Sequence, residues 1–212
     1  MAEKISNIQG MAVPYIVGKI DTDELAPTME SLYILDWPEL ADAFCAKTRK
    51  RDPNHVLNDP KYSRATILFT GNTFGCGSSR EHAPQAALTR YKAIVAPSYA
   101  PIFLANSFAI GLPAVTISDE DLLVARDVWI ANPQTEFRVD LVSKTLSWDS
   151  LSLPIDLKEF RRQAFIEGKW DERDVLDQNF DKVVLLAARR PYVTGDYPTE
   201  DVLRDKGLLF YV

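Results

Sequence analysis

Residues 71–84, GNTFGCGSSREHAP, combine three glycines with two serines, an arginine, a cysteine and a histidine directly after an apolar run. Three kinds of chemistry use such residues. A glycine-rich turn can cradle a phosphate with its backbone N–H groups. A cysteine or serine can act as a nucleophile when a base activates it. An arginine can grip a carboxylate through its planar fork of donors, with short hydroxyl side chains beside it.

The sequence lacks residues that nucleotide binding and nucleophilic catalysis each require beside this stretch. A dinucleotide fingerprint needs Gly-x-Gly-x-x-Gly, but Gly75-x-Gly77 is not followed by glycine at position 80, and no Gly-Lys-Ser/Thr phosphate loop is present. A nucleophilic Cys76 would need a base, and the two histidines of the chain have no acidic or amide partner that the sequence can place. A Gly-x-Ser-x-Gly elbow is also absent. Cys76 is better interpreted as the filler of a tight, glycine-flanked site.

The remaining interpretation is an anion site. Ser78-x-x-Glu81 matches a capping box with Ser78 at the N-cap, although a helix that starts nearer Pro84 suits proline better. In both cases Ser78, Ser79 and Arg80 lie at or just before the positive end of a helix, which favours a carboxylate or an alkoxide. Taken alone, the motif is explained at least as well by serines that only cap a helix as by an anion site.

The elements that must position this stretch alternate between strands and helices. Strands are predicted at residues 65–69, 93–97 and 113–117, and helices at 81–91, 100–111 and 119–131. A crossover between parallel strands needs a dozen residues and returns the chain in the same direction, so this alternation predicts parallel strands. A hairpin around Ser143-Lys144, within 136–149, adds an antiparallel patch. The predicted fold class is α/β, with a mixed, largely parallel sheet and flanking helices.

The rest of the chain is less regular. The other predicted elements are a strand at about 11–19 that runs into the acidic turn 21–23, one helix within 37–48, and two amphipathic helices at about 157–167 and 174–189. A chain of 212 residues can bury one sizeable core. A single domain is therefore predicted over 1–212, with a C-terminal helical segment and tail from about 156.

Composition excludes several classes of protein. The net charge is −6 and no run of five Lys or Arg is present, so a nucleic-acid partner is not expected, and the basic cluster 47–51 is interpreted as a solvated face. Two cysteines cannot build a disulfide framework or a four-cysteine metal site. The sequence shows neither a signal-peptide pattern nor eighteen consecutive apolar residues, so no membrane association and a cytoplasmic location are expected.

GCGSSREHAP (75–84), together with the acidic DTD turn (21–23) and APSYAPIFLANSFAIGLP (96–113), resembles the small subunits of 3-isopropylmalate dehydratase in the aconitase superfamily. The resemblance runs over most of the chain, from IDTDELAP through HVLNDP to EFRRQAFIEGK. It implies an aconitase-type swivelling domain that covers a partner large subunit. It also implies that the large subunit carries the [4Fe-4S] cluster and that this chain binds no metal or cofactor, which agrees with its two cysteines.

Members of this family move a hydroxyl between adjacent carbons of a small dicarboxylic acid by dehydration and rehydration. By the resemblance, Ser78 matches the catalytic base, which needs strong stabilisation as an alkoxide, and Asp23 is the catalytic aspartate that reaches histidines of the partner. Ser79 and Arg80 match contacts to a substrate carboxylate. The structural turn is expected to comprise Gly75, Gly77, Glu81 and His82.

Specificity is expected from the loop after the DTD turn, where Leu32 and Tyr33 are predicted to contact the substrate. Aconitases have an arginine there for a third carboxylate, whereas this loop is apolar and has no arginine before Arg49. An unpaired buried carboxylate is costly, so an isopropyl or methyl substituent is expected and citrate is disfavoured. The leading function is isomerisation of 2-isopropylmalate and 3-isopropylmalate in leucine biosynthesis. The alternatives are a citramalate or dimethylmalate dehydratase, a homoaconitase, and a non-catalytic binding subunit.

Overall fold

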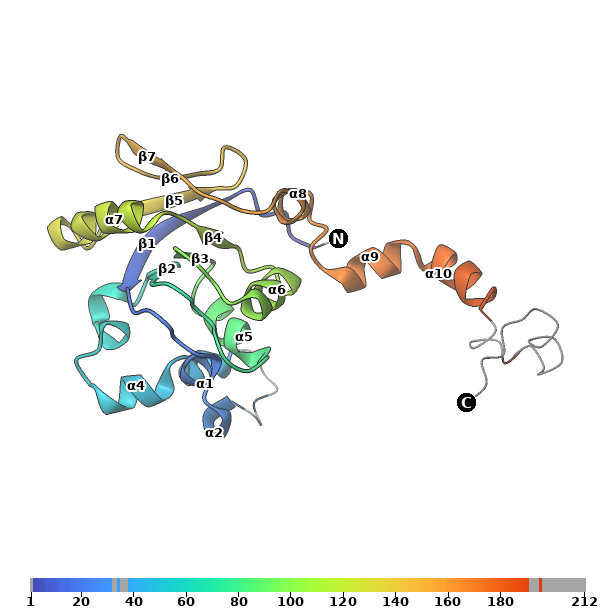
Figure 1. Ribbon diagram of the computed structural model, residues 1–212, viewed down its shortest axis with the longest axis horizontal. Coiled ribbons are helices and arrows are strands. Elements are labelled where there is room, and N and C mark those ends of the chain that lie inside the picture. Colours follow the sequence, from blue (N-terminus) through green and yellow to red (C-terminus); the bar gives the residue numbers. More distant parts are fainter. Residues whose placement is uncertain (1, 32–33, 35–37, 191–194, 196–212) are drawn as a thin grey trace, which may run out of the picture. The chain divides into compact units, whose positions relative to one another are not determined.

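A mixed sheet organises most of the chain in the computed structural model, which describes residues 2–31, 34, 38–190 and 195 (Figure 1). Its strands, in chain order, are β1 (Asn7–Tyr15), β2 (Ile67–Thr70), β3 (Ala93–Ala96), β4 (Ala114–Thr116), β5 (Glu136–Asp140), β6 (Thr145–Trp148) and β7 (Leu151–Pro154). They pair in the order β4-β3-β2-β1-β5-β6-β7. The predicted α/β class and mixed sheet are confirmed. Among these strands, three pairings are parallel and three antiparallel, a smaller parallel share than expected.

Strand β1 joins the parallel and antiparallel halves of the sheet. Its first half, from Asn7 to Met11, pairs antiparallel with β5, and its second half, from Ala12 to Tyr15, pairs parallel with β2. The strand therefore lies about four residues earlier than the predicted range of 11–19. The sequence NIQG that opens it carries too few apolar residues to be recognised alone, since Asn7 and Gln9 are exposed and Ile8 is buried.

Helices follow the parallel strands as the alternation predicted. Helix α5 (His82–Leu88) connects β2 to β3, α6 (Pro101–Ala109) connects β3 to β4, and α7 (Asp119–Ala131) follows β4. The bounds of α7 agree with the prediction because its start signal is local. Ser118 accepts a hydrogen bond from the Asp121 amide at 3.0 Å, and three acidic residues occupy the first turn.

Short helices occupy the long connection between β1 and β2: α1 (Thr22–Leu25), α2 (Thr28–Ser31), α3 (Leu40–Ala43), α4 (Ala46–Arg51) and the 3₁₀ turns Val56–Asn58 and Pro60–Tyr62. The prediction of one helix within 37–48 is wrong, since α3 and α4 are separate. Cys45 has a left-handed φ of 52°, and its amide donates to the Leu25 carbonyl at 3.0 Å instead of continuing α3. A tertiary hydrogen bond thus overrides the local helical pattern.

The core lies on both faces of the sheet. On one face, Val13, Leu68 and Ile94 pack against α1, α3, α5 and α6. On the other, adjacent residues of the same strands face α7 and α8 (Glu159–Glu167), and Phe69 and Phe137 of β5 pack against Trp129. Successive side chains of a strand point to opposite faces, so the continuous apolar runs of β2 and β3 are covered on both sides.

A boundary after Asp171 divides the chain into two compact units. The second begins at Glu172 and contains α9 (Glu172–Gln178) and α10 (Phe180–Ala187). One helix was predicted over 174–189, and Asn179 separates the two that form there. The single domain over 1–212 stays a prediction. No helix in the described part of the chain is long and apolar enough to cross a membrane.

Candidate active site

The DTD turn and the glycine-serine stretch lie side by side beyond the carboxyl ends of β1 and β2. The two strands are parallel neighbours, so the segments that follow them leave the same edge of the sheet. The segments are then joined directly. The Gly75 amide donates to the Ile20 carbonyl at 2.8 Å, and the Thr22 amide donates to the Cys76 carbonyl at 2.9 Å. The topology therefore brings together residues that are more than fifty positions apart in the sequence.

Helix α1 presents its residues in distinct directions. Asp21 is the N-cap of α1, and its carboxylate accepts from the Glu24 amide at 2.8 Å. Thr22 is buried, and its hydroxyl donates to the Ser78 carbonyl at 2.8 Å. Asp21 is thus explained by the turn itself. The next residue, Asp23, is left to face the glycine-serine stretch.

Asp23 accepts hydrogen bonds from two cations on two different segments. Its Oδ1 atom accepts from Nη1 of Arg80, and its Oδ2 atom lies 2.8 Å from Nζ of Lys47 in α4. The amide and the hydroxyl of Thr28 also donate to Oδ1, at 3.3 and 3.2 Å. Lys47 first, and then Arg80, hold the pKa of the Asp23 carboxyl well below its usual range. The three charged groups carry a net charge of about +1.

Arg80 uses one edge of its guanidinium for the protein. Nη1 donates to Asp23 and, at 3.5 Å, to the Ala26 carbonyl. Among the described residues, Nε and Nη2 of Arg80 have no recorded acceptor, and the side chain is 28% exposed. A guanidinium carries five N–H donors in a rigid fork. The arrangement thus orients Arg80 while leaving donors for an external carboxylate.

The two serines are exposed, and within the described residues no hydrogen bond is recorded for either hydroxyl. The capping box predicted from Ser78 and Glu81 is not formed. Helix α5 begins at His82, with Glu81 in the N-cap position and no capping bond from its side chain. Pro84 then falls in the first turn, where it is tolerated. Since neither serine caps the helix, the interpretation of both as mere caps loses its support.

Two glycines shape the turn that carries these side chains. Gly75 has φ of 75° and Gly77 has φ of 91°, a region that favours glycine. A Cβ on Gly75 would lie 2.2 Å from the Phe103 ring, in the fully buried cluster of Phe74 and Phe103. A Cβ on Gly77 would meet only ordinary contacts, the nearest at 3.4 Å to Asp21. The positive φ therefore favours glycine at both positions, and the lack of space for a side chain requires glycine at Gly75 only.

Gly75→Ala is therefore expected to lower the free energy of unfolding by about 3 kcal/mol, from left-handed backbone strain plus overpacking of Phe103. Gly77→Ala is the matched control, because it introduces the same strain without the overlap and should cost about 1 kcal/mol. Urea unfolding of both variants measures the difference. Equal losses for the two variants would mean that Phe103 does not fix the turn.

The other residues singled out in the sequence take supporting places or lie elsewhere. Cys76 is half-buried, and its carbonyl accepts the Thr22 hydrogen bond. His82 is half-buried at the start of α5, and Glu81 is exposed. Leu32 and Tyr33, predicted to contact the substrate, lie outside the described residues. The sequence interpretation missed Lys47 and Thr28, since no local signal shows that residues 24 and 5 positions beyond Asp23 turn back to it.

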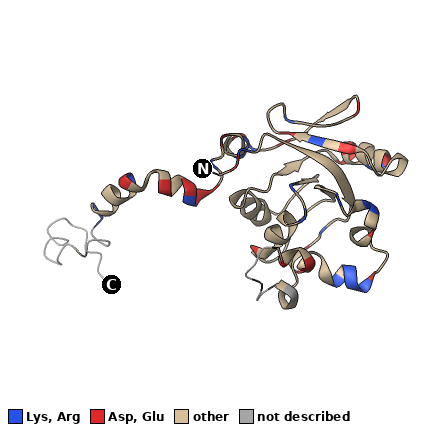
Figure 2. Ribbon diagram, turned by 180° about the vertical axis from the view of Figure 1, so that it is seen from behind, with Lys and Arg blue, Asp and Glu red and all other residues tan. Residues whose placement is uncertain are grey.

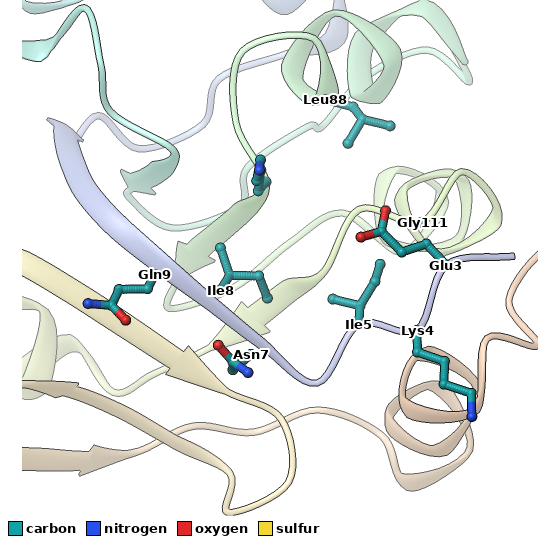
Figure 3. Close-up of a pocket in the computed structure, with 9 residues that line it drawn as sticks. Glu3, Lys4, Ile5, Asn7, Ile8, Gln9, Leu88 and Gly111 are labelled. Carbon is teal, nitrogen blue, oxygen red and sulfur yellow. The ribbon is translucent and has the colours of Figure 1, made fainter.

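Two cavities lie near the two ends of the parallel strands. One of about 470 Å³ adjoins the DTD turn and is lined by residues that include Lys19, Asp21 and Glu24, but Asp23, Arg80 and the two serines do not line it. Another of about 380 Å³ lies at the opposite end of the parallel strands, against the start of β1 and the residues before β3 and β4, among them Ile8, Lys92 and Gly111 (Figure 3). Because ligands of α/β sheets bind beyond the carboxyl ends of the strands, the second cavity is not the candidate site.

Comparisons with known proteins agree with this placement. Residues 39–120, which include the glycine-serine stretch, match the family described as the aconitase C-terminal domain. The 3-isopropylmalate dehydratase small subunit of Thermus thermophilus is 42% identical over 176 residues, 81% of this chain and 87% of that protein. The protein of the same name from Synechocystis is 34% identical over 90% of this chain and 96% of its own.

The fold has also been seen in a solved structure. The crystal structure of 3-isopropylmalate dehydratase from Methanocaldococcus jannaschii superposes with a TM-score of 0.62 at 24% identity, over 82% of this chain and 99% of that one. At this level of identity the match concerns the fold.

Proposed function

Because the chain belongs to the family of 3-isopropylmalate dehydratase small subunits, we propose that it is the small subunit of a hydro-lyase that interconverts 2-isopropylmalate and 3-isopropylmalate in leucine biosynthesis. The observation that carries this proposal is Arg80, which Asp23 holds by one edge beside two exposed serine hydroxyls. Such a site suits a small acid that presents a carboxylate to the guanidinium and an α-proton to a serine.

In this mechanism the chain binds and orients the substrate and moves one proton. The free donors of Arg80 grip a substrate carboxylate, and Ser79 adds a hydroxyl contact to the same group. Ser78 takes the proton from the carbon next to that carboxylate and returns a proton to the adjacent carbon during rehydration. The surplus positive charge of Lys47 and Arg80 over Asp23 stabilises the negative charge on the substrate and on the serine oxygen.

The departing hydroxyl needs a Lewis acid, which the family assigns to a [4Fe-4S] cluster. The residues of this chain do not fit such a cluster. Cysteine thiolates hold Fe–S clusters, four in the common case. This chain has only two cysteines, and Cys45 is fully buried in the core. We therefore place the cluster on a large-subunit partner, which the small-subunit names of the relatives imply, and we derive no step through it. Asp23 would face histidines of that partner, and the swivelling domain over 1–212 would work beside it in the cytoplasm.

The test is to purify the chain with its large subunit under anaerobic conditions and assay a panel of 2-alkylmalates and citrate. Turnover of 2-isopropylmalate is expected to exceed that of citrate by about 10²-fold in kcat/KM, because an apolar loop cannot pair a third carboxylate. Preference for a methyl-substituted substrate would favour the citramalate alternative. Preference for citrate over every alkylmalate would contradict the apolar-loop argument, and inactivity on the whole panel would contradict the function.

A further inference from the structure

Helix α4 and the residue before it are docked onto three consecutive residues of α1. Nζ of Lys47 contacts Asp23, the hydroxyl of Thr48 donates to the Glu24 carboxylate, and the Cys45 amide donates to the Leu25 carbonyl at 3.0 Å. The left-handed turn at Cys45 separates α4 from α3 and aims the first residues of α4 at α1. The Lys47 contact is therefore one part of a joint between two helices, rather than a chance meeting of exposed side chains.

Asp23 consequently lies between two structural elements that each supply a cation. Lys47 approaches one carboxylate oxygen from α4, along which Lys and Arg gather in Figure 2, and Arg80 approaches the other oxygen from the glycine-serine stretch. The oxygen that Arg80 uses also accepts both donors of Thr28. With Oδ2 taken by Lys47, Arg80 reaches Asp23 through Nη1 alone.

We propose that Lys47 is a positioning residue of the site: by holding Oδ2 of Asp23, it keeps the second edge of the Arg80 guanidinium available for the substrate carboxylate. Without Lys47, both oxygens of Asp23 face the fork of Arg80, and carboxylate and guanidinium favour a bidentate pair. That pair would engage the donors that the substrate needs. Loss of Lys47 would also lower the charge around Asp23 and Arg80 by one, which weakens the attraction for a dianionic acid.

This inference rests on the proposed function, since the substrate carboxylate is the group for which Arg80 is kept. The variant Lys47→Met preserves much of the stem and removes the charge. In the complex with the large subunit, it is expected to raise KM for 2-isopropylmalate by about 5- to 20-fold and to change kcat by less than about threefold. Lys47→Arg, which restores a cation within reach of Oδ2, should recover most of the loss.

Lys61 provides a matched control. Its Nζ lies 2.8 Å from Oδ2 of Asp59, and the exposures of that pair, 46% and 33%, resemble the 47% and 41% of Lys47 and Asp23. Lys61→Met removes a surface ion pair of the same geometry away from the site and should leave KM unchanged. The salt dependence of KM is a second readout. Loss of the Lys47 charge should make KM less dependent on salt, whereas a merely structural role of Lys47 would leave that dependence unchanged.

The outcomes separate this inference from the proposed function. Normal wild-type turnover with the same KM in Lys47→Met and Lys61→Met overturns the role of Lys47 and leaves the function standing. An equal fall of kcat in Lys47→Met and Lys47→Arg, with KM unchanged, also overturns it. If the wild-type complex turns over no alkylmalate, NMR of the Arg80 guanidinium in the full chain decides. Slower solvent exchange of its Nε and Nη2 hydrogens in Lys47→Met than in Lys61→Met supports the positioning contact, because a bidentate pair with Asp23 engages those donors, and equal exchange overturns it.

Discussion

Replacing Ser78 with alanine is expected to lower kcat of the reconstituted enzyme by about 10²- to 10⁴-fold, the range that a positioned general base contributes. The hydroxyl is exposed and has no recorded partner among the described residues, so its loss removes little from the folded chain. A change in the free energy of unfolding within about 0.5 kcal/mol is expected, as at other surface positions. Loss of turnover with retained stability would locate the defect in the chemistry.

Ser79→Ala is the natural comparison for this variant. The two serines are adjacent and both exposed, but Ser79 is proposed to bind a carboxylate and Ser78 to move a proton. The Ser79 variant should therefore lose affinity, with KM raised by about 5- to 20-fold, and keep most of kcat. Exchange of the substrate α-proton with solvent deuterium gives a second readout, which only Ser78→Ala should suppress. If Ser78→Ala kept wild-type kcat, the base assignment would be wrong and the non-catalytic alternative would gain support.

The parts of the fold that could be predicted from the sequence carry their signals within a few residues. Helix α7 has its N-cap at Ser118 and an acidic first turn, and the hairpin of β5 and β6 alternates apolar and polar residues on both sides of its turn. Strand β7 was not predicted, because Leu151–Pro154 is short, largely exposed and ends in proline. Local sequence patterns thus identified the main helices and strands, and they failed for a strand whose solvent exposure leaves it without a clear apolar pattern.

The errors near the site have a different cause. The helix predicted within 37–48 is interrupted because Cys45 hydrogen-bonds to Leu25, and the cluster 47–51 was interpreted as a solvated face although Lys47 contacts Asp23. Both interactions join residues about twenty positions apart within a connection of short helices. Hydrophobic periodicity along the sequence therefore cannot predict them. The family resemblance pointed to Asp23 and Arg80 separately. Their ion pair, between residues 57 positions apart, follows only from the parallel pairing of β1 and β2.

That ion pair makes Arg80→Lys the second variant with a large expected effect. Lysine keeps the positive charge but presents a point charge in place of a planar fork. A lysine at this position can contact either Asp23 or a substrate carboxylate with good geometry, but not both. The guanidinium of Arg80 has donors for Asp23 on one edge and for the substrate on the other. We expect kcat/KM to fall by about 10²-fold, because the carboxylate is no longer held in the orientation that brings the α-proton to Ser78.

A matched substitution distinguishes loss of the fork from general damage. Nη2 of Arg138 lies 3.0 Å from Oδ2 of Asp140 on the exposed surface of β5, so Arg138→Lys changes the same chemistry away from the site and should leave kcat/KM within about twofold. Wild-type kcat/KM in Arg80→Lys would show that charge alone suffices and would contradict the proposed bidentate grip.

A double-mutant cycle with Asp23→Asn then tests whether Asp23 acts through Arg80. If its role is to hold one edge of the guanidinium, Asp23→Asn should cost little further activity once Arg80 is lysine, and the two effects on kcat/KM should be far from additive. Fully additive effects would mean that Asp23 acts independently, as it would if its main contact were with histidines of the partner. The cycle therefore separates the two roles that the site allows for the same carboxylate, one within the chain and one across the subunit boundary.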